Sequence, residues 1–276
     1  MTIEAGDTSE RSLAHWSEAQ RKEMDAFYAV ATQDYRELAQ AWPWAEQFES
    51  ALHRKGSIRI LDVACGSGKF PSALRQHTSI GAIGGTPISI DLLDPSAFSL
   101  AEARRNLAAP MTAGQDFECT LQELPSNIGS YDLVWAVHAL YALPEHELDA
   151  GTQAFLRALG GGLGFIAHAR SSAHYLRFYE AYRKKRPDAT PYTDGDAVEA
   201  AFRRAGASVE VQELHYEQLV QNEAVLEGFL QRCLFDSELT LEDMRADSAL
   251  GAYLESTRTD DGYCFSQDVA MLFIRR

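Results

Sequence analysis

The chain has 276 residues, of which 46% are hydrophobic and 24% are charged. These values are ordinary for a globular protein that buries a core, and they allow one large domain or two small ones. The 25 Lys and Arg residues and 40 Asp and Glu residues give a formal charge of −15, which repels the phosphates of nucleic acids and of anionic lipids. We therefore expect neither nucleic acid nor a membrane as a partner.

The cysteines and the N-terminal segment indicate a cellular compartment. The four cysteines lie far apart without a C-x-x-C pair, so neither a zinc site nor a disulfide framework is expected. The N-terminus carries no basic segment followed by an apolar run, and no stretch reaches the roughly 18 apolar residues of a membrane span. We expect a reduced, cytoplasmic protein.

The pattern of apolar residues changes near residue 55. Residues 1–12 are polar and predicted to be frayed, and 13–53 have the spacing of two or three amphipathic helices. From residue 58, short aliphatic runs alternate with helical segments, which is typical of a parallel sheet covered by helices on both faces. We assign residues 1–55 to an N-terminal helical cover and 56–276 to an α/β domain. Its predicted strands are 58–64, 87–94, 116–120, 131–137, 163–169, 208–216 and 263–276, and its predicted helices are 71–77, 96–107, 145–159, 171–185 and 194–205.

A helical insertion is predicted between the last two strands. Residues 221–261 have the pattern of two helices, 222–234 and 239–257, and hold ten acidic against three basic residues, which is −7 of the −15. This balance serves solubility, or it attracts a cationic substrate. In the second case KM at low salt should rise when acids of the insertion are neutralised, such as Glu223, Glu227, Asp236 and Glu238.

The segment 60–70, ILDVACGSGKF, combines an apolar strand that ends at Asp62 with a turn of small residues, 64–68. Glycines in a strand-to-helix turn let the backbone approach a ligand without a Cβ in the way. A dinucleotide fingerprint needs a third glycine where this chain has Pro71, so a nicotinamide-dependent oxidoreductase is the weaker interpretation. A plain turn is the other alternative.

A second acidic residue ends the next strand. In the segment 90–107, IDLLDPSAFSLAEARRNL, the strand ends at Asp94 and a helix begins near Ser96. A carboxylate at this tip can accept both hydroxyls of a ribose. Asp91 is the fallback for this role, and the alternative is that Asp94 or Ser96 only caps the helix.

These two segments together resemble motifs I and II of the class I S-adenosylmethionine-dependent methyltransferases, and the similarity covers about residues 25–275. The D-x-S-x-x-x-L-x-x-A spacing that begins at Asp94 favours it over Asp91. The resemblance implies a Rossmann-like, seven-stranded, mostly parallel sheet with helices on both faces, an N-terminal helical lid and a helical insertion before the last strand. It implies S-adenosylmethionine as the cofactor, bound by Tyr28, Asp62, Ala64, Gly66, Ser67, Gly68, Asp94, Pro95, Ser96, Thr120, Leu121, Gln122 and Val137.

One part of this assignment departs from the family. Many members place an acid at the adenine amino group, whereas the matching position here is Thr120, followed by Leu121 and Gln122. A hydroxyl, an amide or backbone groups can bond the adenine edge instead. Val137 ends the predicted strand 131–137, and His138 follows it directly. In an open α/β sheet, ligands bind at this C-terminal edge of the strands.

Methyl transfer from a sulfonium requires mainly that a nucleophile is held in line with the methyl group in a water-poor pocket. His138 is the candidate for orienting or deprotonating that nucleophile, and the alternatives are a lining residue or a cofactor contact only. His168 closes the next strand and could approach His138. Two histidines without a carboxylate make a poor Mg²⁺ site, so no metal is expected.

A looser resemblance links the chain to the histamine N-methyltransferase group, through DPSA (94–97), YDLVWAVHALYAL (131–143), the segment 170–188 and FSQDVAMLFI (265–274). A Tyr-containing N-terminal helix lids the cofactor in the wider family; core packing is the alternative for Tyr28 and Tyr35. The expected function is methylation of a small molecule, with a cationic amine favoured. The alternatives are O- or C-methylation of a natural-product intermediate and a non-catalytic S-adenosylmethionine-binding module. The substrate residues that the resemblances imply are Gln33, Tyr35, His138, Tyr141, His168 and Gln267.

Overall fold

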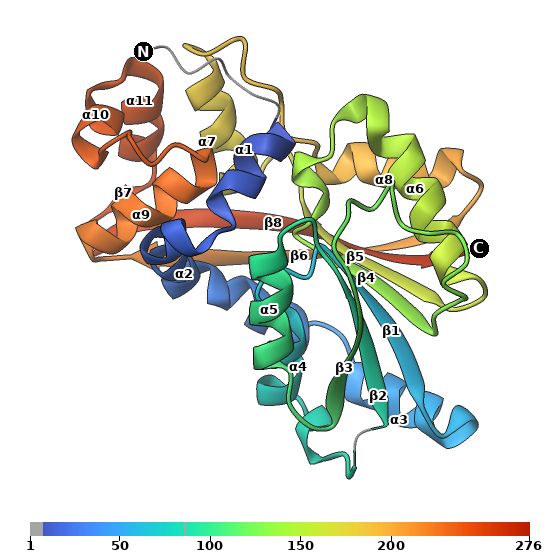
Figure 1. Cartoon of the computed structure of the whole chain (residues 1–276). Coiled ribbons are helices and arrows are strands. Elements are labelled where there is room, and N and C mark those ends of the chain that lie inside the picture. The colour runs from blue at the N-terminus through green and yellow to red at the C-terminus, as the bar shows by residue number, and fades with distance from the viewer. Residues whose placement is uncertain (1–7, 86) are drawn as a thin grey trace.

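The computed structural model describes residues 8–85 and 87–276. Within them lies an eight-stranded sheet in the order β3-β2-β1-β4-β5-β8-β6, with the short strand β7 paired to β8 (Figure 1). β1 to β5 are parallel, whereas β8 runs antiparallel to both β5 and β6. The strands are β1 (Ile58–Val63), β2 (Ile88–Leu93), β3 (Met111–Phe117), β4 (Leu133–Val137), β5 (Leu163–Ala169), β6 (Ser208–Val220), β7 (Arg258–Thr259) and β8 (Gly262–Arg275).

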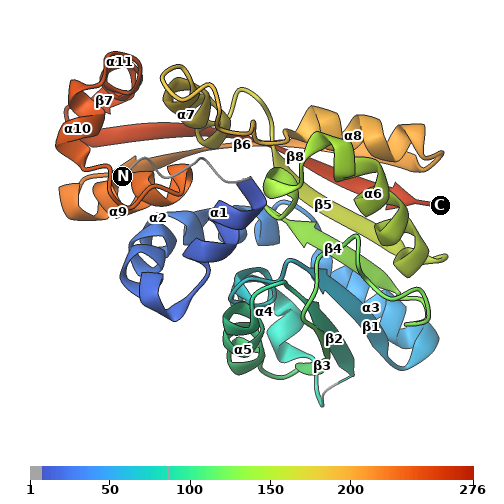
Figure 2. The same cartoon turned by 45° about the horizontal axis from the view of Figure 1, so that its top comes forward.

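Helices cover both faces of the sheet. One face packs against α3, α4 and α5, and the other against α6 and α8. A third group, α7, α9, α10 and α11, gathers beside the far ends of β6 and β8, and α1 and α2 lie between this group and α4 (Figure 2). The bounds are α1 (Thr8–His15), α2 (Arg21–Gln40), α3 (Trp44–Lys55), α4 (Lys69–His77), α5 (Ala97–Asn106), α6 (Glu145–Leu159), α7 (His174–Arg183), α8 (Gly195–Arg204), α9 (Glu223–Leu234), α10 (Leu241–Ala246) and α11 (Ser248–Ser256).

The central strand β1 is held in place by apolar residues on both of its faces. Ile58 and Ile60 pack on the face that α3 and α4 cover, whereas Leu61 and Val63 pack on the opposite face. Both sets are buried, which confirms the expectation of a strand covered on two sides. Because burial holds the strand in place from both faces, the turn that follows Val63 has a fixed starting point.

The strand order reverses between β1 and β4. β2 and β3 lie to one side of β1, and β5 lies beyond β4. In open α/β sheets this reversal leaves a crevice outside the carboxyl ends of the two central strands. β1 is followed by the turn 64–68 and β4 by His138. The topology thus brings the predicted cofactor turn and the predicted catalytic histidine to one edge.

The third strand differs from the prediction. It spans Met111–Phe117 rather than 116–120. It is the edge strand of the sheet, and its residues Gln115 and Asp116 are exposed. An edge strand with polar residues in its second half lacks the continuous apolar run by which the central strands are found. The sheet also holds one strand more than predicted, since the two-residue strand β7 adds a short hairpin to β8.

Two helical predictions are also corrected. The segment predicted to be frayed, 1–12, overlaps α1, Thr8–His15, while residues 1–7 lie outside the described residues. The predicted helix 239–257 is divided into α10 and α11 at Asp247, whose backbone is extended and whose side chain accepts the N–H groups of Ala249 and Leu250. Asp247 therefore caps a new helix. The remaining predicted helices lie within three residues of their observed bounds.

The insertion is carried by a long two-stranded ribbon. β6 and β8 pair from Ser208 opposite Arg275 to Val220 opposite Tyr263, and α9, α10, α11 and β7 lie between them in the sequence. Figure 1 shows these helices at the far end of the ribbon from α6 and α8. Among the helices that the structure describes, none has the length and apolar character needed to cross a membrane.

Candidate functional site

Two adjoining cavities lie at the carboxyl edge of the sheet. One, of about 800 Å³, is lined by the turn after β1 and the loop after β2, and we call it the cofactor cavity. The other, of about 650 Å³, is lined by residues of α2, α7 and α9, and we call it the acceptor cavity. Because four residues line both, the two cavities share a wall: Trp16, Tyr35, His138 and Tyr141.

The turn after β1 depends on its glycines. Gly66 and Gly68 have φ values of +51° and +68°, a region that side chains rarely adopt. A Cβ on Gly68 would lie 3.1 Å from the Cα of Ala103, so this glycine lets α5 pack closely against the turn. A Cβ on Gly66 would lie 3.7 Å from the hydroxyl of Tyr28. Tyr28 therefore packs against the turn but lines neither cavity, so its contact with the cofactor stays a prediction.

Asp94 connects the two predicted motifs. Its Oδ2 accepts the N–H of Gly66 at 3.0 Å, and its Oδ1 accepts the N–H of Ser96 at 2.9 Å. The carboxylate is 7% exposed and lines the cofactor cavity, and burial raises its pKa to about 6. Ser96 caps α5 through the N–H of Ser99 and donates to the carbonyl of Trp16 at 2.7 Å. Helix capping thus belongs to Ser96, and Asp94 has lone pairs left for a ligand.

The fallback residue Asp91 has a different environment. Its Oδ2 accepts hydrogen bonds from Arg59 at 2.7 Å and from the Tyr131 hydroxyl at 2.9 Å, and its Oδ1 accepts the N–H of Gln115. Neither cavity is lined by Asp91. These contacts make Asp91 a link between strands and support Asp94 for the ribose.

The remaining charged groups of the cofactor cavity fit S-adenosylmethionine. Asp62 is 4% exposed, its Oδ2 has no hydrogen-bond partner among the described residues, and burial raises its pKa to about 8. An unpaired buried carboxylate suits the ammonium of a ligand. Lys69 lines the same cavity, with its Nζ 4.3 Å from the ring centroid of Tyr28, and supplies a cation for a ligand carboxylate. The site thus offers two acids and one base to a ligand with an ammonium, a diol and a carboxylate.

His138 lies in the wall between the cavities. Its backbone φ is +50°, an uncommon value for a side chain other than glycine and one that clusters at functional sites. Burial, and then the neighbouring His168, lower the pKa of His138 to about 3, so the ring is uncharged near neutral pH. Its Nε2 has no hydrogen-bond partner among the described residues. A neutral ring with a free nitrogen can orient an acceptor group without repelling a sulfonium.

The acceptor cavity is aromatic, with one buried acid in its wall. Asp34 is 2% exposed and accepts hydrogen bonds from Tyr175 at 2.6 Å, from Tyr216 at 2.8 Å and from the amide of Gln218 at 2.6 Å. Burial raises its pKa to about 7. The aromatic residues that line this cavity are Trp16, Phe27, Tyr35, Tyr141, Tyr175, Tyr192 and Phe235.

Neither Asp34 nor the second charged residue of this cavity, Arg232, was predicted from the sequence. The sequence contains a pattern that indicates each of them. Asp34 lies four residues after Val30 and four before Leu38, so an acid interrupts the buried face of α2. Arg232 interrupts the apolar run 229–235, FLQRCLF. A charged residue at a core position of a helix is a candidate for a buried functional role.

Of the other predicted substrate residues, His168 and Gln267 lie at or behind the acceptor cavity and Gln33 does not. His168 lines it; its Nε2 lies 3.1 Å from the carbonyl of Thr193, its Nδ1 lacks a partner among the described residues, and burial lowers its pKa to about 4. Gln267 is fully buried and donates to Gln218 at 2.8 Å, so it supports the residue that holds Asp34. Gln33 lines neither cavity and donates to the carbonyl of Glu217.

The predicted adenine residues lie outside both cavities. Thr120 bonds Glu123 through its hydroxyl at 2.9 Å, Gln122 bonds Glu147, and Leu121 packs in the core beside α6. Their contact with adenine stays a prediction. Ser67 is 4% exposed within the turn, and its carbonyl accepts the Asn106 amide. The remaining predicted cofactor residues that line the cofactor cavity are Ala64, Gly66, Pro95 and Val137.

The acidic residues of the insertion have structural partners. Glu223 pairs with Arg245, Glu227 accepts the N–H of Leu241, and Asp236 accepts the Tyr182 hydroxyl. These three and Glu238 line neither cavity. Within residues 8–85 and 87–276, no group of three or more His, Cys, Asp or Glu side chains is placed to hold a metal ion.

Comparisons with known proteins agree with this geometry. Residues 60–162 match a family model described as a methyltransferase domain. A putative methyltransferase from Bacillus halodurans C-125 has 15% identity and a TM-score of 0.56, over 83% of this chain and 97% of that one. Magnesium protoporphyrin IX methyltransferase from Synechocystis PCC 6803, crystallised with S-adenosylhomocysteine, has 12% identity and a TM-score of 0.52, over 96% of this chain and 99% of that one. No curated protein sequence matches the chain.

The fold and the turn after β1 define an enzyme that uses S-adenosylmethionine as its methyl donor. Residues 60–162 are a methyltransferase domain, and the chain has the fold of the class I S-adenosylmethionine-dependent methyltransferases, as the motifs of the sequence predicted. These similarities concern the family as a whole, and the narrower resemblance to histamine N-methyltransferases stays a prediction.

Proposed function

We propose that this methyltransferase transfers the methyl group to the nitrogen of a small amine, which binds as a cation in the acceptor cavity. The observation that carries the proposal is the buried carboxylate of Asp34 in an aromatic wall. A carboxylate attracts an ammonium, and aromatic faces attract cations as well. A phenolic acceptor would gain a hydrogen bond from this acid, as Tyr175 and Tyr216 do, but not the charge attraction that an ammonium gains.

The reaction assigns separate tasks to two residues of this chain. S-adenosylmethionine supplies an electrophilic methyl group on a sulfonium. The nitrogen lone pair forms the new N–C bond while the S–CH₃ bond breaks and its electron pair stays on sulfur, and the ammonium must first lose a proton. Asp34, with its pKa raised to about 7, is suited to accept that proton near neutral pH. Nε2 of His138 accepts an N–H hydrogen bond of the acceptor and orients it toward the shared wall.

The cover and the domain boundaries are part of the same proposal. The proposed boundaries are 1–55 for the helical cover, of which the structure describes 8–55, and 56–276 for the methyltransferase domain, with 221–261 as the insertion that contributes to the acceptor cavity. Trp16 and Tyr35 of the cover line both cavities. They exclude water from the reacting atoms, as a displacement at a sulfonium requires.

A methylation assay with matched acceptors tests the proposal. The full chain, with S-adenosylmethionine labelled in the methyl group, is offered tyramine, 4-ethylphenol and a panel of further amines, phenols and enols. We expect transfer to amines, and at least a ten-fold loss of kcat/KM for the amine in Asp34→Asn, with unchanged affinity for S-adenosylhomocysteine. Transfer to phenols or enols alone, with equal activity of Asp34→Asn, would replace the proposal by O- or C-methylation.

A further inference from the structure

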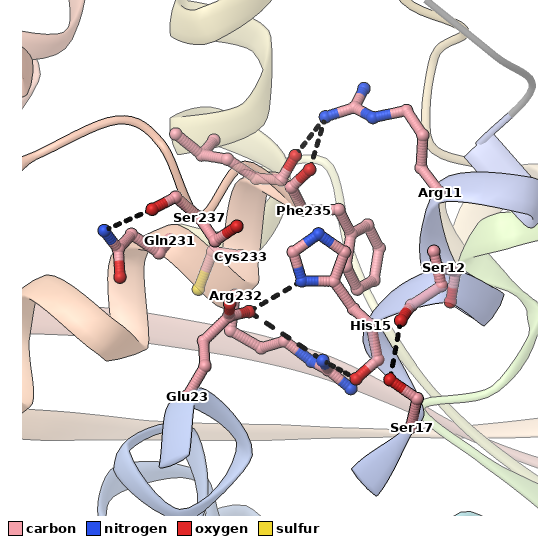
Figure 3. Close-up of polar contacts among 12 residues, drawn as sticks. Arg11, Ser12, His15, Ser17, Glu23, Gln231, Arg232, Cys233, Phe235 and Ser237 are labelled. Atoms are coloured by element: carbon pink, nitrogen blue, oxygen red, sulfur yellow. Dashed lines mark hydrogen bonds and ion pairs between the residues drawn. The ribbon is translucent and has the colours of Figure 1, made fainter. Parts of the chain in front are cut away.

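The second charged residue of the acceptor cavity is Arg232, on α9 of the insertion. It is 1% exposed and lines the cavity with its neighbours Cys233 and Phe235. Figure 3 shows its guanidinium between the side chain of Glu23 and the backbone of His15. Arginine stays protonated in proteins, so the cavity wall holds a buried positive charge as well as Asp34.

The local partners of Arg232 leave part of its guanidinium unused. Nη1 donates to the carbonyl of His15 at 2.5 Å, whereas Nη2 has no hydrogen-bond partner among the described residues. The nearest carboxylate, Oε1 of Glu23, lies 3.8 Å from Nη1, which is too long for a hydrogen bond. That same oxygen already bonds Nδ1 of His15 at 2.8 Å. Glu23 thus forms an ion pair with the guanidinium but leaves Nη2 without a hydrogen bond.

Aromatic packing orients the guanidinium without satisfying its hydrogen bonds. The Cζ atom lies 4.0 Å from the ring centroid of Trp16 and 5.5 Å from that of Phe235. Both rings line the acceptor cavity. A buried guanidinium N–H without an acceptor costs free energy in the protein alone, and an anion in the cavity removes that cost.

We infer that Arg232 binds an anionic group, a carboxylate, of the methyl acceptor. Arginine suits this role because its planar guanidinium matches a carboxylate in shape and charge. The inference rests on the proposed function, because the acceptor then carries an ammonium for Asp34 and a carboxylate for Arg232. The substrate class becomes an amine that also bears a carboxylate, such as an aromatic amino acid, rather than a simple cationic amine.

A purely structural role is the competing explanation, since Arg232 also ties α9 to the end of α1. Glu23→Gln separates the two roles. Glu23 belongs to the same polar cluster but lines neither cavity, so its loss disturbs the cluster and leaves Nη2 of Arg232 in place. A structural role predicts the same effect on ligands for Glu23→Gln and Arg232→Met.

Calorimetric titration of the full chain saturated with S-adenosylhomocysteine tests the inference. The probes are 3-(4-hydroxyphenyl)propionate, its methyl ester and tyramine. In the wild-type protein we expect the carboxylate to bind at least ten-fold more tightly than the ester. Arg232→Met should abolish this preference and Arg232→Lys should restore part of it. Glu23→Gln should keep it. Affinity for S-adenosylhomocysteine and the melting temperature report the folding of each variant.

The outcomes separate this inference from the proposed function. Equal binding of carboxylate and ester, or a preference that survives Arg232→Met, overturns the anion site and leaves amine methylation standing. Equal losses of the preference in Glu23→Gln and Arg232→Met assign Arg232 to structure and also overturn it. In a third outcome, tyramine fails to bind, whereas 3-(4-hydroxyphenyl)propionate binds the wild-type protein more tightly than it binds Arg232→Met. The anion site then holds and the amine assignment fails.

Discussion

The carboxylate of Asp34 accepts a 2.6 Å hydrogen bond from the hydroxyl of Tyr175, although 141 positions separate the two residues. The bond connects α2 of the N-terminal cover to α7, and further bonds from Tyr216 and Gln218 connect the same carboxylate to β6. The residue that we propose to bind the acceptor therefore also fixes the cover over the sheet. Three donors pre-orient the carboxylate, so little rearrangement is needed when a cation binds.

Binding of an amine should depend on pH through Asp34. Its pKa is raised to about 7, so the carboxyl group is neutral below and ionised above that pH in the free protein. Affinity for tyramine, which stays cationic throughout, should fall by up to about tenfold per pH unit below pH 7. Calorimetry at pH 6, 7 and 8 on the S-adenosylhomocysteine complex measures this. Asp34→Asn should bind weakly with a flat profile, and an unchanged slope in that variant would assign the effect to another group.

The stability of the ligand-free protein should fall between pH 6.5 and 8. Burial raises the pKa values of Asp34 to about 7 and of Asp62 to about 8, so the folded state holds protons that the unfolded state has released, and their contribution is lost as the pH rises through those values. Burial lowers the pKa values of three histidines, so their titration changes the free energy of unfolding only below pH 6.5. They are His138, His168 and His174. We expect a loss of about 2 kcal/mol over this window.

Denaturant unfolding at pH 6.5 and 8 checks that loss. Asp62→Asn should remove more than half of it, because Asp62 has the higher pKa of the two. The sign is the opposite of that of a salt-bridged carboxylate, whose contribution is lost on acidification. Stability that rises from pH 6.5 to 8 in the wild-type protein would contradict the assignment.

Gly68→Val should abolish cofactor binding. The φ of +68° and the 3.1 Å approach to Ala103 leave no room for a β-branched side chain. Gly161→Val is the matched control, since a Cβ there meets nothing within 4 Å. Calorimetry with S-adenosylhomocysteine should show no binding for the first variant and wild-type affinity for the second. Retained affinity in Gly68→Val would place the cofactor elsewhere.

Substitutions of Asp94 and Asp91 should have different effects on cofactor binding and on stability. Asp94→Ala should weaken S-adenosylhomocysteine binding by about 10- to 100-fold, the loss of one or two charge-assisted hydrogen bonds. Asp91→Asn should lower the melting temperature, because it disturbs the contacts with Arg59 and Tyr131, and leave affinity within about twofold. The reverse pattern would assign the ribose to Asp91.

Neutralising the four insertion acids should raise KM for a cationic amine only slightly. None of Glu223, Glu227, Asp236 and Glu238 lines a cavity, so only their long-range field acts on the substrate. We expect a rise below about threefold at 0.01 M salt that vanishes at 0.15 M, where the Debye length is about 8 Å. A larger rise that persists at 0.15 M would place one of these acids beside the substrate.

The sequence predicted the cofactor half of the site better than the acceptor half. The turn 64–68 and Asp94 each follow a buried strand, so local spacing and the parallel topology suffice to bring them together. Asp34 and Arg232 were missed because their roles arise from packing between α2, α7 and α9, segments that are distant in sequence. An acid on a helix has the same local pattern whether it faces solvent or a cavity, and only its place on the buried face of α2 distinguishes it. The predicted position of the edge strand β3 was wrong for a related reason. An exposed strand can hold polar residues, so its apolar pattern does not mark its bounds.

The β6–β8 ribbon separates the two halves of the site in evolutionary terms. The cofactor cavity is lined by no residue of 221–261, whereas Arg232, Cys233 and Phe235 of that segment line the acceptor cavity. The segment leaves the sheet and returns to it at one end of this ribbon, and its helices also pack against α2 and α7. Exchange of the segment would therefore change the wall of the acceptor cavity and leave the turn after β1 and Asp94 in place, provided that the facing residues of α2 and α7 change with it.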